Sequence, residues 1–266
     1  MAVVVIASAT GAPGVTTTAL GLALTWPRHV LLADCDRDPS QAVQAGYLRG
    51  MDHGGRGLVA LAHLHREGLP LAPEIWRHTL PLIQHGDVQR RFLPGFSTAG
   101  ASRLFEHVWR SLGEAFEAHE QQGVDIIVDA GRIGSTGLPA GLLASADVVL
   151  VAVRSSLRSL AGARIHLATL DEQLRNIPAA PPAALAVLGP GRPYATGEIS
   201  AQFGLPVWVE TAWDPRAAEV LSDGADEPRR FHEGSFMSRF RADAKALSER
   251  LARLREATDL VTAGAR

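Results

Sequence analysis

The stretch Ala2-Val-Val-Val-Ile-Ala-Ser-Ala-Thr-Gly-Ala-Pro-Gly-Val-Thr-Thr-Thr18 decides the fold. Residues 2–7 are a continuous apolar run rich in β-branched side chains, which is typical of a strand covered on both faces of a parallel sheet. Residues 11–14 contain two glycines and a proline, and residues 16–26 then have the pattern of a helix that Pro27 stops. A strand, a glycine loop and a helix in this order predict a phosphate-binding cradle at the start of the helix.

The loop of this cradle contains no lysine. Of the 26 lysines and arginines in the chain, only Lys245 is a lysine, and it lies far from residues 8–18. In a standard phosphate loop, a lysine reaches the β- and γ-phosphates while backbone N–H groups hold the rest. The sequence therefore predicts the backbone cradle without its charge.

Composition limits the class of protein. The chain has 266 residues, of which 46% are hydrophobic, so it can bury a full core. A net charge of -2 argues against a strongly basic nucleic-acid binder, although a local basic face stays open. One cysteine, Cys35, excludes an intramolecular disulfide and fits a reducing compartment. No apolar stretch is long enough to span a membrane, and we expect a soluble, cytoplasmic protein.

The remaining pattern alternates strands with helices, and no internal repeat or linker divides it. We therefore expect one α/β domain over residues 1–266, with a doubly wound, mainly parallel sheet and helices on both faces. The expected strands are 29–33, 91–94, 124–128, 148–153, 183–188 and 206–210, and the expected helices are 58–66, 101–119, 157–174 and 236–260. Within 101–119, helical spacing places Leu104, Val108, Leu112 and Phe116 on one face.

Acidic residues follow two of the expected strands. Asp34 and Asp36 come directly after the second strand, and Asp129 ends the strand that begins at residue 124. Open α/β sheets bind ligands at the carboxyl ends of their strands, so we expect these carboxylates to lie near the glycine loop.

The sequence resembles the ParA/MinD family of deviant-Walker P-loop ATPases, because it has a glycine loop, then an acidic pair and then a later aspartate, in this order. Gly11, Gly14, Thr16 and Thr17 match positions of that family's loop. Thr10 falls on the family's signature lysine and Val15 falls on its Walker lysine. The resemblance therefore identifies a degenerate member, and it implies a protein that binds ATP and magnesium.

The resemblance also assigns roles to single residues. It implies that Asp34 and Asp36 are catalytic and that Thr16 and Asp129 hold magnesium. It implies a base pocket closed by residues 213–221, while residues 188–192 lack the asparagine with which the family often reads adenine. The implied nucleotide-binding residues are Gly11, Ala12, Pro13, Gly14, Val15, Thr16 and Thr17.

The missing charges have chemical consequences. Loss of a charge-assisted contact at the phosphates costs on the order of 2 to 4 kcal/mol of transition-state stabilisation, so we expect slow hydrolysis unless another cation substitutes. Arg37, Arg132 and Arg154 are candidates, because each lies at or just beyond an expected strand end. Each of them alone is also explained as a solvated rim arginine. In the family the signature lysine crosses the dimer, so Thr10 removes the usual latch of a homodimer.

Three functions stay open at this stage. The first is a nucleotide-binding positioning or assembly scaffold with little hydrolysis, and within the family the lysine-poor loop leans toward the pilus and secretion-apparatus branch of the TadZ/CpaE type. The second is an active ATPase for chromosome or plasmid partition, with an arginine in place of the lysine. The third is an interaction module that binds no nucleotide. The first two imply a homodimer with a protein partner, and the partition alternative also implies DNA.

Other conspicuous residues favour structural explanations. His63 and His65 fall on different faces of a helix, which argues against a shared zinc site. Cys35 lies between two aspartates that disfavour a thiolate, and we interpret it as a small core residue. The helix expected at 236–260 is amphipathic, but its polar face mixes both charges. We expect it to dock on the sheet or on a partner helix.

Overall fold

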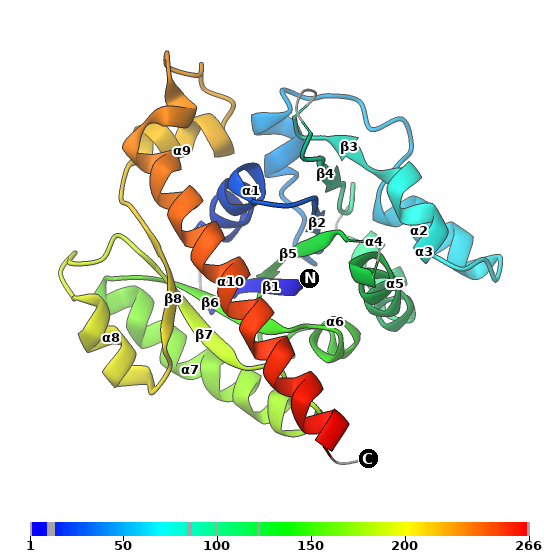
Figure 1. The fold of residues 1–266 in the computed structure, drawn as a ribbon. Helices are drawn as coiled ribbons and strands as arrows, with labels where there is room; N and C mark the ends of the chain where they lie inside the picture. Colours follow the sequence, from blue (N-terminus) through cyan, green and yellow to red (C-terminus); the bar gives the residue numbers. More distant parts are fainter. Residues whose placement is uncertain (1, 10–13, 84–86, 99, 122, 265–266) are drawn as a thin grey trace.

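A computed structural model describes residues 2–9, 14–83, 87–98, 100–121 and 123–264. Within these ranges an eight-stranded sheet forms the centre of the molecule, in the order β3-β4-β2-β5-β1-β6-β7-β8 (Figure 1). All neighbouring strands run parallel except β3, which pairs antiparallel with β4. The strands are β1 (Val3–Ser8), β2 (Val30–Asp34), β3 (Leu80–Pro81), β4 (Arg90–Leu93), β5 (Asp125–Arg132), β6 (Val148–Arg154), β7 (Ala183–Leu188) and β8 (Val207–Thr211).

The alternation of side chains along β1 explains why helices cover both faces. Val3, Val5 and Ala7 enter one apolar cluster, whereas Val4 and Ile6 enter the other, and all five are buried. The first cluster is covered by α2 (Leu58–Arg66), α3 (Ala72–Ile75), α4 (Ala101–Leu104), α5 (Trp109–Gln121), α6 (Ala140–Ala144), α7 (Leu157–Arg175) and α8 (Thr196–Phe203). The second is covered by α1 (Val15–Thr25), α9 (Pro215–Ser222) and α10 (Ser235–Gly264). The expected doubly wound α/β fold is therefore confirmed.

The C-terminal helix α10 docks on the core. Phe236, Phe240, Leu247 and Leu251 are buried in the second cluster, and Figure 1 shows α10 crossing the molecule beside α1. Gly21 of α1 makes this approach close, because a Cβ there would lie 2.5 Å from the Phe240 ring. Docking on the core, one of the two expectations for this helix, is what the structure shows.

The helix expected over residues 101–119 is wrong as a single element. The chain leaves α4 after Leu104 and starts α5 only at Trp109, and Leu104 is 79% exposed instead of lying on the apolar face. The break buries Phe105 against Phe96 and Trp109, with ring centroids 5.3 and 4.6 Å apart. Packing of these aromatic rings therefore outweighs the continuous helical periodicity.

Three short helical turns complete the element order: a π-helical turn η1 (Val43–Tyr47) and the 3-10 turns η2 (Trp76–His78) and η3 (Phe231–Glu233). Turn η1 packs backbone against backbone on the end of α9. A Cβ at Gly46 would overlap the carbonyl oxygen of Ser222, and one at Gly224 would lie 2.7 Å from the carbonyl oxygen of Gly46. Only glycine permits this contact between two distant segments.

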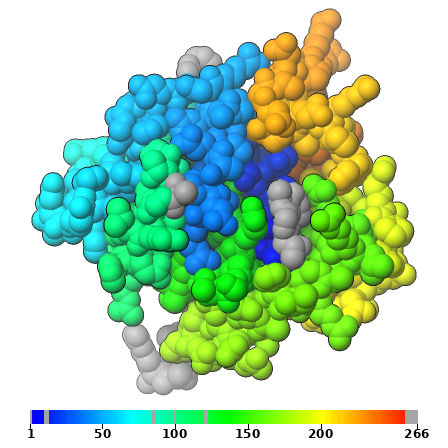
Figure 2. Space-filling view, turned by 180° about the vertical axis from the view of Figure 1, so that it is seen from behind, coloured from blue at the N-terminus to red at the C-terminus, as the bar shows by residue number. Residues whose placement is uncertain are grey.

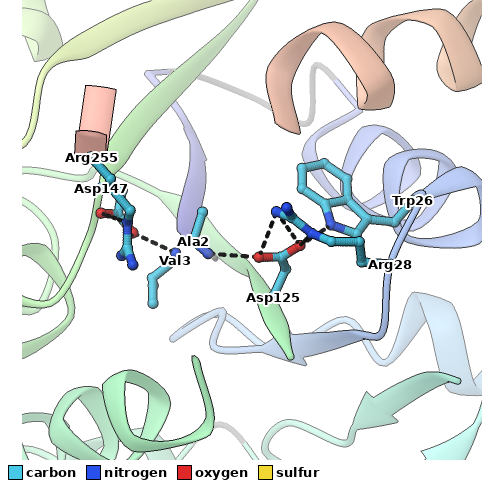
Figure 3. A network of polar contacts seen from close by, with 7 residues as sticks. All are labelled: Ala2, Val3, Trp26, Arg28, Asp125, Asp147 and Arg255. Carbon is cyan, nitrogen blue, oxygen red and sulfur yellow. Dashed lines mark hydrogen bonds and ion pairs between the residues drawn. The ribbon is translucent and has the colours of Figure 1, made fainter. Parts of the chain in front are cut away.

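At the amino edge of the sheet, two carboxylates hold several chain segments together (Figure 3). Asp125 accepts hydrogen bonds from the backbone N–H of Ala2 at 2.6 Å, from Trp26 Nε1 at 2.6 Å and from Arg28 Nε at 2.9 Å. Asp147 accepts from the backbone N–H of Val3 at 2.7 Å and from two nitrogens of Arg255 at 2.9 and 2.6 Å. These bonds fix β1 and the end of α10 to the sheet.

Candidate functional site

The strand order arranges the chemistry along the carboxyl edge of the sheet. The residues at the strand ends are, in spatial order, Asp34 on β2, Asp129 near the end of β5, Ser8 on β1, Arg154 on β6, Leu188 on β7 and Thr211 on β8. Neighbouring strands lie about 4.8 Å apart, so the distance from β5 to β8 is roughly 19 Å. The edge therefore has an acidic side and, several strands away, a side that ends in Thr211 and Trp213.

One pocket of about 520 Å³ runs along this edge. Gly14 to Thr18 at the start of α1 line it, together with Asp36, Arg132 and Arg154. The rest of its lining comes largely from Leu188 and from residues 211–222. In Figure 2 the dark-blue N-terminal segment is seen in a hollow bordered by blue, green and orange segments. Asp36, the described part of the predicted loop and the predicted base region thus line one pocket, whereas Asp34 and Asp129 are not among its lining residues.

The acidic side contains two buried carboxylates on neighbouring strands. Asp34 and Asp129 are register partners in the parallel pair β2–β5 and are 8% and 3% exposed. Burial, and then the charge of Asp129, raise the pKa of Asp34 well above its usual value. Burial also raises the pKa of Asp129 to about 6, against the hydrogen bonds that it accepts from Thr16 and from the N–H of Gly131. Both carboxylates therefore lack adequate compensation for their charge.

Asp36 is held at the mouth of the same acidic side. Its Oδ1 accepts the backbone N–H of Asp38 at 2.9 Å, and its own N–H donates to Asp34 Oδ1 at 3.3 Å. A Cβ at Gly131, where φ is +62°, would overlap the Asp36 carboxylate. Burial raises the pKa of Asp36, while Arg132 and Arg37 lower it. Gly131 thus brings the Asp36 carboxylate directly over the β5 backbone.

The described part of the loop begins at Gly14, because Gly11, Ala12 and Pro13, like Thr10, lie outside the described residues. Gly14 has φ 90°, which suits glycine, and it starts α1. Thr16 and Thr17 face the pocket at this helix start. Val15 also lines the pocket but is only 6% exposed and belongs to the second apolar cluster. Val15, which the resemblance matches to the Walker lysine, is therefore partly built into the core.

The three candidate arginines occupy different places. Arg132 and Arg154 line the pocket. Arg37 is not among the lining residues and instead donates to the carbonyl oxygens of Ile133 and Gly137, in the loop that follows β5. The structure therefore keeps two candidates and gives Arg37 a structural role.

The side of the pocket beyond β7 is aromatic, and two hydroxyls of the pocket lining, one at the start of α1 and one at the end of β8, are unpaired among the described residues. Arg154 Cζ lies 5.2 Å from the ring centroid of Trp213, which is 42% exposed. Asp214 caps α9 by accepting the N–H of Ala217 at 3.0 Å. Thr18 and Thr211 are 0% and 5% exposed, and their Oγ1 atoms have no hydrogen-bond partner among the described residues. Buried hydroxyls without partners cost about 1 to 3 kcal/mol each, which marks a place where an occupant would be stabilised.

The other conspicuous residues lie away from this chemistry. His63 and His65 are on the regular helix α2, and the described residues contain no group of three metal-ligating side chains. Cys35 is fully buried in the first apolar cluster, where burial raises the pKa of its thiol, as expected for a core residue. No helix in the described ranges is long and apolar enough to cross a membrane.

Comparison of the whole fold with solved structures gives one consistent result. The MinD cell division protein of Aquifex aeolicus superposes with a TM-score of 0.69 at 15% identity, covering 94% of this chain and 98% of that one. A ParA family ATPase of Chlorobium tepidum reaches 0.67 at 17% identity, covering 92% and 98%. This chain has the MinD/ParA fold. MinD of Pyrococcus horikoshii, solved with Mg-ADP, has the same fold, with a TM-score of 0.67 at 18% identity over 92% of this chain and 95% of that one.

No family model and no curated protein matches the sequence. Within the MinD/ParA fold, this chain therefore differs strongly in sequence from the proteins that it superposes on. The features that sequence reasoning missed are the stacking of Arg154 on Trp213 and the unpaired hydroxyls of Thr18 and Thr211. Both depend on β6 and β8 lying at the same edge as α1, which no local pattern encodes.

Proposed function

We propose that this protein binds a magnesium nucleotide at the carboxyl edge of its sheet and uses it to bias dimerisation or partner binding, with little hydrolysis. The observation that supports this most is a pocket that joins the start of α1, the Asp36 carboxylate and an aromatic side, next to the buried Asp129, which accepts a hydrogen bond from Thr16. A nucleotide has the same division into charged phosphates and a planar base.

The acidic side fits a magnesium ion held by one carboxylate and one hydroxyl, with water and phosphate as its other ligands, since the described residues contain no group of three metal-ligating side chains. Among the described residues, no arginine or lysine forms an ion pair with Asp34, Asp36 or Asp129. A hard divalent cation prefers carboxylate and hydroxyl oxygens and would compensate these charges. Thr16 and Asp129 would hold the metal, and Asp34 and Asp36 would accept hydrogen bonds from water around it. The metal would supply the positive charge that no arginine or lysine supplies to these carboxylates in the described ranges.

The start of α1 fits phosphate through its backbone. The N–H groups at the first turn of an eleven-residue helix point toward the pocket end, and Thr16 and Thr17 add hydroxyls. Gly11, Ala12 and Pro13 would extend this cradle, as the sequence predicts. Val15 contributes packing and no charge. A bound triphosphate would therefore have no lysine from position 15 beside the bond that hydrolysis breaks. This favours binding over turnover.

The cellular role proposed for such a protein is a positioning or assembly scaffold. Proteins with this fold include a MinD solved in complex with MinC, which is a partner protein. By analogy, we propose that the nucleotide-bound form is a homodimer that recruits a protein partner of a positioning, pilus or secretion system in the cytoplasm. Thr10, outside the described residues, would leave this dimer without the family's lysine latch.

An arginine-assisted ATPase is a second candidate, because Arg132 and Arg154 line the pocket. It predicts measurable turnover that is lost on replacing one of these residues. The partition version of this candidate adds salt-sensitive retention on DNA. The third function, an interaction module, predicts no nucleotide binding at all.

Titration calorimetry with ATP and magnesium tests the proposal. We expect binding by the unchanged chain, about ten-fold or more weaker binding by Thr16→Ala and Asp129→Asn, and no change for Asp171→Asn, an exposed acid on α7. Light scattering with and without nucleotide then reports dimerisation, and phosphate release reports turnover. Absence of heat at high protein concentration would leave only the interaction module. Turnover near one per second would instead favour the ATPase.

A further inference from the structure

Arg154 and Trp213 contact each other across the pocket. The guanidinium carbon lies 5.2 Å from the ring centroid, and both residues line the pocket. Trp213 also packs against Gly189, where a Cβ would lie 3.2 Å from the indole Cε3 atom. The indole is therefore placed by the loop after β7 and covered by a cation from β6.

An incoming base competes well for the indole surface. A cation–π contact at an exposed site shifts an equilibrium by about two- to five-fold, whereas stacking of a base on an aromatic side chain shifts it by about five- to a hundred-fold. The hydroxyl of Thr211, at the end of β8, lines the same pocket and lacks a partner among the described residues, so it could bond the polar edge of that base. A base therefore makes a stronger contact with the indole than the guanidinium does.

The displaced arginine has a use within the same pocket. Arg154 ends β6, the strand next to β1, and Ser8 at the end of β1 pairs with Ala152 in the register of these strands. The loop that follows Ser8 is the one whose Walker lysine position holds Val15. A guanidinium released from Trp213 therefore lies one strand from the place that lacks a cation.

We propose that a purine base replaces Arg154 on Trp213, and that the displaced guanidinium then binds the phosphates in place of the missing lysine. This inference rests on the proposed nucleotide function and adds to it a coupling between the two halves of the ligand. Base binding at β8 would release the cation that serves the phosphates near β1. Hydroxyls both donate and accept, so this site would bind ATP and GTP within about ten-fold of each other.

Half-ligands separate the two steps. Adenosine carries the base without phosphates, and inorganic tripolyphosphate with magnesium carries phosphates without a base. For Trp213→Ala we expect adenosine to bind about ten- to a hundred-fold more weakly and tripolyphosphate to bind at least as tightly as to the unchanged chain, because Arg154 is no longer held on the ring. For Arg154→Ala we expect tripolyphosphate to bind about ten-fold or more weakly and adenosine to bind equally well or better.

Two conservative variants keep the test valid if an alanine variant unfolds. Trp213→Phe retains a stacking ring, so adenosine affinity should change by less than about five-fold, while the fluorescence change on binding is lost. Thr211→Val removes only the hydroxyl and should weaken adenosine by about three- to ten-fold. Trp208→Phe is the matched control, because Trp208 lies on β8, which precedes Trp213, but does not line the pocket, and it should change neither affinity.

The outcomes distinguish this inference from the proposed function. If ATP binds but neither Trp213→Ala nor Arg154→Ala changes the affinity for adenosine or for tripolyphosphate, the inference is wrong and the nucleotide function stands. If Arg154→Ala weakens adenosine as much as tripolyphosphate, the exchange on Trp213 is also wrong. A hundred-fold preference for ATP over GTP contradicts recognition by hydroxyls. If neither ATP nor either half-ligand binds, the inference falls together with the proposed function.

Discussion

The two edges of the sheet bury the same kind of side chain in opposite electrostatic settings. At the amino edge, Asp125 and Asp147 accept hydrogen bonds from Arg28, Arg255, Trp26 Nε1 and two backbone N–H groups of β1. At the carboxyl edge, Asp34, Asp36 and Asp129 have no ion pair with an arginine or lysine in the described ranges. In the described ranges, the acids at the carboxyl edge therefore lack the charge-assisted partners that Asp125 and Asp147 have at the amino edge.

Because of this difference in partners, a bound cation would stabilise the carboxyl edge more than the amino edge. Paired acids stabilise the fold because their desolvation is offset by several charge-assisted bonds. Undercompensated acids destabilise the fold until a cation arrives, and their raised pKa values record that cost. Asp147 is intermediate, because burial raises its pKa to about 6 although Arg255 and the N–H of Val3 contact it.

The largest expected effect is at the amino edge. Asp125→Ala leaves the N–H of Ala2, Trp26 Nε1 and the Arg28 guanidinium without their acceptor, so we expect a loss of about 3 to 5 kcal/mol in the free energy of unfolding. Urea denaturation measures it. Asp125→Asn keeps an acceptor oxygen and should lose clearly less. If Asp125→Ala lowers the free energy of unfolding by less than about 1 kcal/mol, the carboxylates of the amino edge do not stabilise the fold as we expect.

Ligand should stabilise the carboxyl edge in a pH-dependent way. At a hundred-fold excess over its dissociation constant, a bound magnesium nucleotide adds about 2.7 kcal/mol. Because the pKa of Asp129 is raised to about 6, the carboxylate is largely protonated near pH 5 and ionised near pH 8. The rise in melting temperature with Mg-ADP should therefore be larger near pH 8. An equal rise at both pH values would contradict a role of Asp129 in holding the metal.

Removing a carboxylate at the carboxyl edge should stabilise the protein without ligand. The pKa of Asp34 is raised, so its ionisation lowers stability progressively as pH rises above about 4. Asp34→Asn cannot ionise, and we expect it to gain on the order of 2 kcal/mol near pH 8 and little near pH 4. Thermal unfolding across this range measures the gain, with the exposed Asp171→Asn as control. A loss of stability at pH 8 would show that Asp34 is compensated after all.

The smallest effect is expected at the end of α10. Arg255→Met removes the bidentate contact to Asp147 but keeps an apolar stem, and both side chains are partly exposed, so we expect a loss of about 0.5 to 1 kcal/mol. The loss should be greatest above pH 6, where Asp147 is ionised. Hydrogen exchange of the α10 amides near residue 255 should detect it. Unchanged protection there would mean that apolar packing alone holds the helix.

Elements that bury continuous apolar runs could be predicted from the sequence. The runs 148–153 and 183–188 became β6 and β7 because parallel strands covered on both faces need no polar alternation. Helices α8 and α9 were missed because each has only eight residues, although Asp214 followed by Pro215 is a recognisable start signal for α9. The expected helix 101–119 failed because contacts of Phe105 with distant Phe96 outweighed local propensity.

For the candidate site, the sequence pointed to residues that the structure places near one another, because glycine loops and acids at strand ends obey a general rule of α/β sheets: Asp36 and Thr16 line one pocket, and Asp129 accepts a hydrogen bond from Thr16. Their proposed roles remain predictions. Choosing among the candidate arginines needed coordinates, as Arg37 turns to the loop after β5. The structural role of Asp125 was also missed, although a charged residue inside an apolar strand run signals a buried partner.

The glycine contact between η1 and the end of α9 has a consequence for the order in which the site is assembled during synthesis. Turn η1 follows the acidic loop, whereas α9 follows Trp213, so opposite walls of the pocket come from early and late parts of the chain. A nascent chain that lacks α9 carries the loop and the acids but has no second wall, and long-range contacts of this kind form late. The proposed nucleotide would therefore stabilise only chains in which α9 has been synthesised.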